Sequence, residues 1–481
     1  MPPFLRQFFA IRPVDPADRS GAQRLKQVLG PWQLTSIGLG ATIGTGVFVL
    51  TGQVAAGYAG PAVTLSFLIA AFVSALAALC YAEFATFLPV PGSAYSYTYA
   101  TLGEGIAWFI GWNLLLEYAI SASAVAVSWS AYVVNLLKGW GINLPDILVH
   151  APYEQNDAGH LYATHAILNV PAVLIVAAMS YVCYVGISHS ARANTIMVTL
   201  KVAIILVFMV AGLKYINTSN WHPYVPQNTG EFGHFGLTGI LRGSAVIFFS
   251  YVGFDTASTT ALEARNPQRD LPVGIIGALV ISTVLYVGMA IVMTGMVPYT
   301  SLKVDEPVAV ALDAHRELAW LAPFVKAGII IGMTSVILAS ILGQPRILLS
   351  MADDGLLPPV VRRCHPRYKT PHIATIISGA VAALFAGVFP LDVLAEVISI
   401  GILLAFAVVC IGVLIMRVKR PDVPRPFRVA WAPVVCILGA LGCLSMCLAL
   451  SSATWLRLLV WTIVGMGIYF AYGYRHSRLR Q

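Results

Sequence analysis

The stretch that decides the fold is residues 40–48, Gly-Ala-Thr-Ile-Gly-Thr-Gly-Val-Phe, which lies inside an apolar run at 33–56. Clustered glycines weaken a helix, since each Gly costs roughly 1 kcal/mol relative to Ala in a helix interior. A second stretch, Phe-Phe-Ser-Tyr-Val-Gly-Phe-Asp at 248–255, interrupts another apolar run in the same way. We therefore expect two membrane helices that are each broken near the middle.

The composition predicts a membrane protein. Hydrophobic residues make up 58% of the 481 residues and charged residues only 10%, whereas soluble domains carry roughly 25% charged residues. A span needs about 20 apolar residues, and the chain has room for about twelve. The expected spans fall roughly at 33–56, 61–88, 98–137, 170–187, 190–213, 238–265, 272–297, 320–349, 371–390, 391–417, 430–451 and 453–474. The predicted fold class is an all-α membrane protein with about twelve transmembrane helices.

The basic residues predict the orientation. With twelve spans, 21 of the 29 Lys and Arg fall on the side of the termini, seven on the other side, and Lys201 within a span. Cytoplasmic loops carry the excess of Lys and Arg, so we expect a multi-pass protein of the plasma membrane with both termini cytoplasmic. The formal net charge of +8 then reflects topology, with membrane lipid as the surroundings and no nucleic-acid partner.

The two interrupted runs predict an internal symmetry. Each is the first of five consecutive runs, and because five is odd the second set enters the membrane from the opposite face. Interrupted helices at matching positions of inverted repeats indicate a transporter binding site. The expected organisation is a cytoplasmic tail at 1–30, five-helix repeats at 31–213 and 236–417, two further helices at 430–474, and a cytoplasmic tail at 475–481.

The first interruption, Gly44-Thr45-Gly46, has two readings of equal weight. An unwound helix frees backbone N–H groups, and the half-helix that resumes there carries a partial positive charge suited to a carboxylate. Alternatively, Gly40 and Gly44 have the spacing of a small-residue packing face between membrane helices. At the second interruption, the freed carbonyls of Phe249, Ser250 and Val252 offer acceptors for an ammonium group.

Lys201 is a lone charge in the middle of a span, in Val-Thr-Leu-Lys-Val-Ala-Ile at 198–204. Such charges are costly and mark functional sites by default, so we favour a proton-carrying role over a structural ion pair. Glu117 also lies mid-span, and a structural ion pair and a role in binding are equally favoured for it. For Asp255 we favour a helix N-cap over direct substrate contact, and for Glu396 a place near the outer interface.

Enzyme and metal signatures are absent from the sequence. The seven cysteines show no metal-ligand spacing and lie mostly in apolar runs, and we find no zinc-protease histidine pair, Gly-x-Ser-x-Gly elbow or phosphate-binding loop. We expect no enzyme activity, no catalytic residue, no metal and no cofactor.

Several longer motifs, in order, carry a resemblance to a known family. They are residues 38–52 with the Ile-Gly-Thr-Gly-Val-Phe core, Pro-Val-Pro-Gly-Ser-Ala-Tyr at 89–95, and 248–267, 331–334, 342–346, 354–359 and 399–401. From about Val28 to about Arg417 the chain resembles the amino acid–polyamine–organocation superfamily, in particular its cationic-amino-acid-transporter-like branch. It departs from the family pattern at Ile402, where Thr is common, and at Asp353, where Arg is common.

The resemblance implies a five-plus-five inverted-repeat fold, alternating access and a set of site residues. The Gly44–Gly46 amides look like a carboxylate cradle, in a loop that also holds Ile43. Lys201 matches a fifth-helix lysine whose ammonium would hold both broken helices together through their carbonyls and release them on deprotonation. The remaining matches are the α-ammonium acceptors Thr42, Phe249, Ser250 and Val252, and the residues Glu117 and Met333 at the side-chain end of the pocket.

The predicted function is proton-coupled symport of amino acids. Small or medium neutral substrates are favoured because Met333 offers no polarity to a guanidinium, and cationic ones come second. An obligate exchanger and a sensor that binds without transporting remain as alternatives, and an intramembrane enzyme ranks last. The sequence leaves any accessory subunit unknown.

Overall fold

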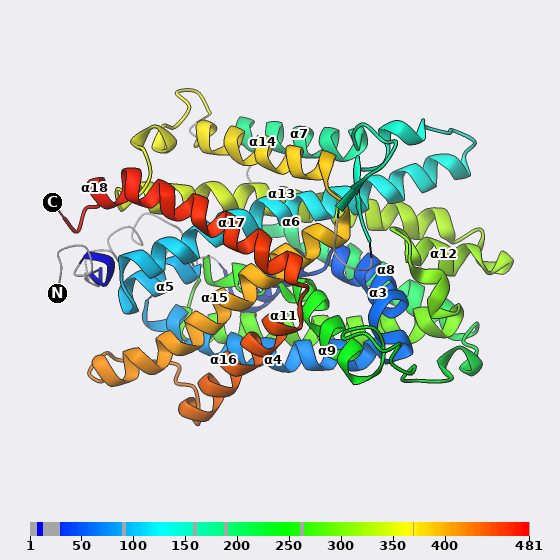
Figure 1. Cartoon of the computed structure of the whole chain (residues 1–481), viewed down its shortest axis with the longest axis horizontal. Helices are drawn as coiled ribbons and strands as arrows, with labels where there is room; N and C mark the ends of the chain where they lie inside the picture. The colour runs from blue at the N-terminus through cyan, green and yellow to red at the C-terminus, as the bar shows by residue number, and fades with distance from the viewer. Residues whose placement is uncertain are drawn as a thin grey trace.

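The computed structural model describes residues 7–12, 29–88, 93–156, 161–186, 191–259, 264–368 and 370–480. They form a bundle of long helices whose axes follow the long axis of the molecule (Figure 1). Most of the expected tail at 1–30, residues 89–92 of the motif at 89–95, and residues 260–263 of the stretch 248–267 lie outside the described residues.

The first half of the described chain is almost entirely helical. Its elements are α2 (Pro31–Thr42), the π-helix η2 (Gly46–Leu50), α3 (Thr51–Val54), the π-helix η3 (Ala55–Ala59), the 3₁₀ turn η4 (Gly60–Ala62), α4 (Val63–Phe87), α5 (Ser93–Thr101), α6 (Glu104–Gly139), η5 (Asp146–Leu148), β1 (Tyr153–Gln155), β2 (Leu161–Ala163), α7 (Val170–Val185), α8 (Ala191–Leu213) and η6 (Thr218–Trp221).

The second half continues in the same way. Its elements are α9 (Gly236–Ile247), the 3₁₀ turn η7 (Phe248–Tyr251), α10 (Thr256–Thr259), α11 (Pro267–Met296), η9 (Tyr299–Leu302), α12 (Pro307–Asp313), η10 (Arg316–Leu318), α13 (Ala322–Asp353), η11 (Pro359–Arg362), α14 (His372–Val388), α15 (Leu391–Lys419), α16 (Ala432–Ala449), α17 (Ser452–Ile468), η12 (Tyr469–Gly473) and α18 (Tyr474–His476).

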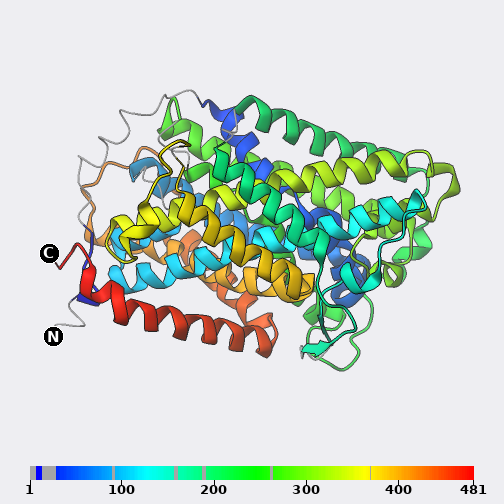
Figure 2. The same ribbon diagram turned by 90° about the horizontal axis from the view of Figure 1, so that it is seen from above.

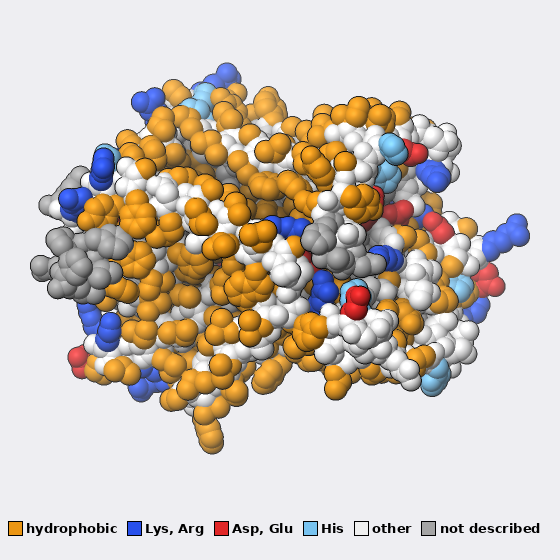
Figure 3. Space-filling model, viewed as in Figure 1, with side chains coloured by type: hydrophobic (Ala, Val, Ile, Leu, Met, Phe, Trp, Pro, Cys, Tyr) orange, Lys and Arg blue, Asp and Glu red, His pale blue; other side chains and the backbone are white. Residues whose placement is uncertain are grey.

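The helical membrane class predicted from composition is confirmed. In the part of the chain that the structure describes, nine helical segments are long and apolar enough to cross a membrane, and α7 and α14 are shorter apolar helices. Large apolar side chains such as Phe72, Leu174 and Val284 are exposed, and the space-filling view shows hydrophobic side chains over a large part of the face toward the viewer (Figure 3). Lipid is the environment in which such a surface is stable.

The helices bring the two interrupted stretches to the centre. Helix α2 packs against α11, α8 and α13, and α6 packs along α13. The first described residues and α18 lie at the same end of the molecule in both ribbon views (Figures 1 and 2). This arrangement agrees with an even number of membrane crossings.

Two local features differ from the expected runs. A short antiparallel hairpin pairs Tyr153 with Ala163 in the long connection between α6 and α7, a feature that the predicted all-α class does not include. The expected run at 98–137 is divided into α5 and α6 by Gly103, whose φ of 109° is readily adopted only by glycine.

A buried ion cluster holds α4 to α15. The Arg417 guanidinium donates to both carboxylate oxygens of Glu83, at 3.0 Å from Nε and 2.5 Å from Nη2. The backbone N–H of Val429 donates to the same carboxylate at 2.9 Å, and Arg425 Nε lies 3.6 Å away. The Glu83 side chain is only 1% exposed, so opposite charges offset the cost of burying its own.

The described N-terminal segment docks on the end of the bundle that carries α18. Gln7 donates to the Tyr474 carbonyl at 2.9 Å, and Arg12 lies 3.2 Å from Asp354. The ring of Phe8 sits where a Cβ at Gly105 would be. This segment therefore connects α6, the end of α13 and α18.

Candidate functional site

The first interruption lies where the glycine cluster predicted a weak point. Helix α2 ends at Thr42, Ile43 is extended with φ −76° and ψ 102°, and helical structure resumes as η2 at Gly46. A π-helix is rare, and short π segments occur frequently at functional sites. In the described chain, the backbone N–H groups of Gly44, Thr45 and Gly46 donate to no residue outside their own helical turn.

The second interruption follows the same course. Helix α9 ends at Ile247, η7 makes one 3₁₀ turn, and Val252 is extended with ψ 134°. Gly253 has a φ of 118°, and a Cβ there would lie 2.7 Å from the backbone carbon of Ala41 and 2.8 Å from the nitrogen of Thr42. Conformation and close approach both require glycine at this position, so the second stretch is seated directly on the end of α2.

The two stretches touch through Gly46 and Ser250. A Cβ on Gly46 would lie 2.6 Å from the Ser250 Cα and closer still to its Oγ. The hydroxyls of Thr45 and Ser250 are buried and have no hydrogen-bond partner in the described chain. A buried polar group left unpaired costs about 1–3 kcal/mol, so each hydroxyl marks a place where a polar ligand would be stabilised.

Lys201 reaches the first interruption from α8. Its side chain is buried, and Nζ donates to the carbonyls of Gly40 at 2.8 Å and Ile43 at 3.0 Å. Among the described residues it makes no ion pair with a carboxylate, Glu117 included. Lys201 was expected to bind carbonyls of both broken helices, and the structure does not show this. Both of its hydrogen bonds go to the first interruption, one to Gly40 of α2 and one to Ile43, the residue that caps α2.

Tyr286 on α11 makes the connection that was expected of Lys201. Its hydroxyl lies 2.8 Å from the Thr42 carbonyl and 3.1 Å from the Ser250 carbonyl, so one hydrogen is shared between the two interruptions. Sequence reasoning missed this residue, which resembles any aromatic in an apolar run. The available signal was the rule that a buried tyrosine hydroxyl usually finds a partner.

These bonds engage three of the four carbonyls predicted to accept an ammonium group. Those of Thr42 and Ser250 accept from Tyr286, and that of Phe249 accepts from the Val252 N–H at 3.0 Å. A carbonyl oxygen has two lone pairs, so each retains capacity for a second donor.

The two glycines of the alternative packing reading face different helices. A Cβ on Gly40 would lie 2.9 Å from Asn194 and 3.0 Å from Val198 on α8, whereas one on Gly44 would lie 3.3 Å from Val336 on α13. Close helix approach therefore explains Gly40, next to which Lys201 binds. It leaves Gly44 as part of the unwound stretch.

A small cavity brings some of the predicted residues together. Its volume is about 30 Å³, and Glu117, Val252 and Asp255 line it with Val336 and Ser340. Met333 is buried on α13 outside this cavity, and its neighbour Gly332 packs against the Lys201 stem. The other predicted residues lie outside the cavity walls; they are Thr42, Ile43, Gly44, Thr45, Gly46, Lys201, Phe249 and Ser250.

Asp255 sits at the start of α10. Its carboxylate accepts from the Ser93 hydroxyl at 3.4 Å, and the backbone amides of Gly253 and Thr256 face it. This environment agrees with the N-cap role favoured from the sequence and also ties the second interruption to the start of α5.

The place near the outer interface expected for Glu396 stays a prediction, and the structure adds that its side chain forms a buried ion pair. It is 2% exposed, its carboxylate lies 3.5 Å from Arg242 Nη2, and the hydroxyls of Ser451 and Thr454 donate to it. The buried pair links α9 to α15 and the α16–α17 turn. Its partners, 55 and more residues away, left no local sequence signal.

The geometry defines a polytopic helical membrane protein with a polar centre built from two interrupted helices. Residues 29–469 match the amino acid permease family, and the chain belongs to that family. The amino acid–polyamine–organocation resemblance, with its cationic-transporter-like branch, is thereby confirmed.

Curated relatives align over nearly the whole chain. The chain is 43% identical over 466 residues to the branched-chain amino acid permease BcaP of Bacillus subtilis, covering 97% of both chains. It is 42% identical over 463 residues to the methylthioribose transporter of the same organism, covering 96% of this chain and 97% of the relative. Cationic amino acid transporter 2, vacuolar, of Arabidopsis thaliana is 38% identical, covering 87% of this chain and 64% of the relative. All three relatives are named as carriers, and none as an enzyme.

Proposed function

We propose that this protein carries free amino acids across the plasma membrane by alternating access, coupled to protons through Lys201. The observation that carries the proposal is the pair of unpartnered buried hydroxyls, Thr45 and Ser250, where the two interruptions touch. An amino acid offers the matching groups. Its carboxylate accepts from N–H and O–H donors, and its ammonium donates to carbonyls.

The carboxylate would lie at the Gly44–Gly46 amides, where a helix resumes and its dipole favours negative charge. The ammonium would use the free lone pairs of the Thr42 and Ser250 carbonyls and the carbonyl of Val252. The cavity of about 30 Å³ has room for no more than a few water molecules. Substrate binding therefore requires the two stretches to move apart, as alternating access would do.

Lys201 supplies the proposed coupling. As an ammonium it donates to Gly40 and Ile43 and stabilises the end of α2 against α8. When the proton leaves Nζ, the neutral amine makes weaker bonds to the same carbonyls, because charge-assisted hydrogen bonds are roughly twice as strong as neutral ones. Loss of the proton would thus loosen the inner half of the first span, and a new proton would restore it.

The favoured substrates are small or medium neutral L-amino acids. One relative is named for branched-chain amino acids, which belong to this neutral class. Cationic amino acids are the second candidate, because Glu117 and Asp255 line the small cavity and neither forms an ion pair in the described chain. Relatives of nearly equal identity are named for branched-chain amino acids and for methylthioribose, so identity alone does not select the substrate.

The proposal includes twelve spans in two inverted five-helix sets. The structure has nine candidate segments among its described residues. One of them, Gly46–Thr86, is divided at Gly60 into two spans, and α2 is joined to the first of these. The shorter helices α7 and α14 bring the number to twelve. In this scheme the broken first and sixth spans are α2 with η2–η3, and α9 with α10. The excess of Lys and Arg at the end that holds α18 supports cytoplasmic termini.

Competition by substrate analogues tests the site directly. We expect the parent amino acid to raise the melting temperature of the purified protein by mass action, and its amide and decarboxylated amine to fail to compete with it. Equal competition by the amide would show that the Gly44–Gly46 cradle is wrong.

Transport assays separate the rival functions. Counterflow in proteoliposomes distinguishes a carrier from a sensor, since a sensor binds but moves nothing. An imposed pH difference distinguishes a proton symporter from an exchanger, because only the symporter accumulates substrate without substrate on the opposite side.

A further inference from the structure

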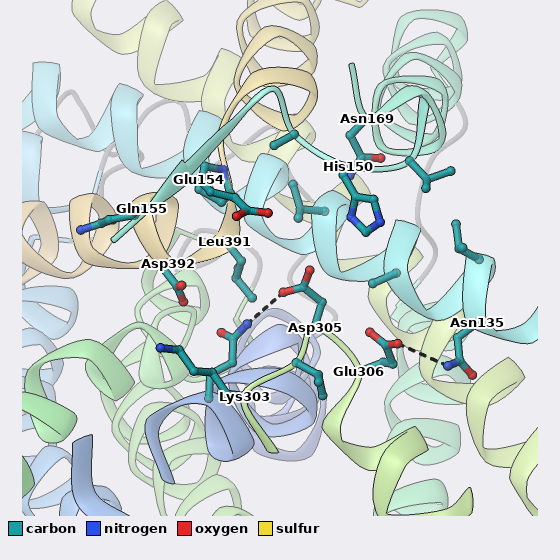
Figure 4. A pocket seen from close by; sticks show the side chains of 18 of the residues that line it. Asn135, His150, Glu154, Gln155, Asn169, Lys303, Asp305, Glu306, Leu391 and Asp392 are labelled. Carbon is teal, nitrogen blue, oxygen red and sulfur yellow. Dashed lines mark hydrogen bonds between the residues drawn. The ribbon is translucent and has the colours of Figure 1, made fainter. Parts of the chain in front are cut away.

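A second and larger cavity, of about 780 Å³, lies apart from the proposed substrate site and contains none of its residues. The segment between α11 and α13, residues 297–321, forms one wall with Lys303, Asp305 and Glu306. Across the cavity lie His150 and Glu154 of the α6–α7 connection (Figure 4). If the termini are cytoplasmic, this cavity is the outer vestibule.

Two adjacent carboxylates of this segment hold two different parts of the molecule. Asp305 Oδ1 accepts from Gln53 Nε2 on α3 at 3.0 Å, and Glu306 Oε1 accepts from Asn135 Nδ2 on α6 at 3.3 Å (Figure 4). Helix α3 belongs to the half of the first span beyond the interruption. The segment is therefore a bridge from the first span to α6.

Apolar contacts seat the same segment. Leu302 and the α12 residues Val308 and Ala309 are fully buried. A Cβ on Gly52 of α3 would lie 2.7 Å from Pro307 Cγ and 3.2 Å from the Leu302 carbonyl. The segment therefore packs closely against α3. Because Asp305 and Glu306 lie between these apolar residues in the sequence, they reach their docked positions together with those residues.

The environment of Asp305 favours its protonated form. Burial raises the pKa of Asp305 to about 6, with the Glu306 and Glu154 charges adding to the rise and His150 opposing it. Gln53 Oε1 is buried without a partner, and a protonated carboxyl can donate to such an acceptor while a carboxylate cannot.

Glu306 shows the same direction. Burial raises its pKa, Asp313 adds to the rise, and Asn135, Lys326 and Lys138 oppose it. The remaining charged groups on the cavity wall are His234, Arg242, Lys303, Asp146 and Asp392.

We propose that residues 297–321 form a proton-operated cover of the vestibule, docked on α3 and α6 when Asp305 carries a proton and released when it loses that proton. The sign follows from linkage. A group that binds its proton more tightly in the docked state is stabilised there by low pH, and that stabilisation is lost as the pH rises through the docked pKa.

The size of the effect follows from the same values. With an ordinary pKa of 3.8 for the released carboxyl and about 6 for the docked one, the docking equilibrium constant falls about tenfold between pH 5 and pH 7.5. Glu306 adds to this in the same direction. The inference rests on the proposed function only in calling the vestibule outer.

Cysteine labelling of the purified full chain, without substrate or gradient, tests the cover. In a Cys364→Ser background, which removes the exposed cysteine of the described chain, Ala309→Cys places a reporter on the buried face of the docked segment itself. Gly57→Cys is the control, because Gly57 lines the same cavity and a Cβ there meets nothing within 4 Å. Both cysteines are labelled with a charged methanethiosulfonate, and the rate at Ala309→Cys is divided by the rate at Gly57→Cys. The intrinsic pH dependence of thiol reactivity is common to both rates and drops out of this ratio.

We expect this ratio to rise about tenfold from pH 5 to pH 7.5. Asp305→Asn keeps the shape and stays neutral, so most of the rise should disappear and the ratio stay low, and adding Glu306→Gln should remove the rest. A flat ratio in the parent, with Ala311→Cys as a second buried reporter, would overturn the proposal. An unchanged rise in the double variant would overturn it too.

Two neighbouring substitutions should move the midpoint in opposite directions. Glu154→Gln removes a charge that raises the pKa of Asp305, so the transition should shift to lower pH. His150→Gln removes a charge that lowers it, so the transition should shift to higher pH. Shifts of the same sign would show that another group titrates. None of these labelling measurements requires transport. A failed uptake experiment would therefore count against the proposed function and not against the cover, and a flat labelling ratio would count against the cover and not against the proposed function.

Discussion

Lys201 and Glu83 are both buried charges of this molecule, but the chain stabilises them in opposite ways. Glu83 faces two guanidinium groups and a backbone N–H, whereas Lys201 faces two carbonyl oxygens. A full opposite charge fixes the ionised state, and removing one partner of such a pair costs about 3–5 kcal/mol. Neutral dipoles leave the ammonium free to lose its proton. Glu83 therefore has a structural role, whereas the surroundings of Lys201 allow its protonation state to change.

The largest expected effect is on transport when Lys201 is replaced. Lys201→Ala should abolish substrate accumulation driven by a pH gradient, because the ammonium is the proposed coupling group and an intramembrane charge marks a functional site. Substrate binding should persist, because the proposed contacts are backbone groups elsewhere. Uptake in liposomes with an imposed pH difference, beside a binding assay, measures both.

The matched control is Lys326→Ala. Lys326 is also a buried lysine on a long helix, but it pairs with Asp313 at 2.8 Å. Its loss frees Asp313 of the proposed cover but should leave substrate accumulation driven by a pH gradient in place. Full proton-driven accumulation by Lys201→Ala would return that residue to a packing role.

The next effect is on stability, and it should spare function. Glu83→Gln leaves two guanidinium groups without their carboxylate and should lower the free energy of unfolding by about 3–5 kcal/mol. Transport per folded molecule should change little. Thermal and denaturant unfolding in detergent measures the loss.

Asp353→Asn is the comparison for that measurement. It breaks a pair with Arg362 in which the two side chains are 61% and 38% exposed, and exposed pairs contribute little. If Glu83→Gln lowered the free energy of unfolding no more than Asp353→Asn does, the structural role assigned to the Glu83 charge would be wrong.

A smaller effect is expected at the hydroxyl that joins the two interruptions. Tyr286→Phe keeps the ring contacts with Phe67 and Tyr251 and removes the donor shared by the Thr42 and Ser250 carbonyls. Loss of one such bond is worth about 1 kcal/mol, so transport should slow by about five- to tenfold. Tyr251→Phe, which removes a hydroxyl bonded to Phe67 in the same aromatic cluster, should change transport far less.

The smallest effect is expected at Glu117. Glu117→Gln removes its charge and keeps its shape, and the charge has no ion-pair partner in the described chain. The protein should express normally, and the ranking of neutral against cationic substrates should shift by about two- to fivefold in competition assays. Loss of folded protein would contradict this and indicate a structural role.

The sequence predicted the features that depend on local composition. Clustered glycines marked the first interruption and Gly253 beside Ser250 the second, and a lone lysine in an apolar run had to find carbonyls or another helix. The helical membrane class followed from the shortage of charge. The residue-level substrate contacts, the twelve-span count and the inverted repeat remain predictions.

The features that depend on distant partners could not be predicted. Tyr286 is distinguished only by the two carbonyls it meets, one of them 244 residues away. Glu83 meets Arg417 across 334 residues, and Glu396 meets Arg242 from another helix. Such pairs depend on how helices pack, and periodicity along one segment carries no information about them.

The hydrogen bond from Gln7 to the Tyr474 carbonyl has a consequence for biosynthesis. The two residues are 467 positions apart, and a ribosome adds about 5–20 residues per second. The first segment therefore waits roughly 25–90 seconds after its own synthesis for its partner to emerge. That end of the bundle can be sealed only after Tyr474 has been synthesised, so a nascent chain stalled before α18 would leave this segment undocked.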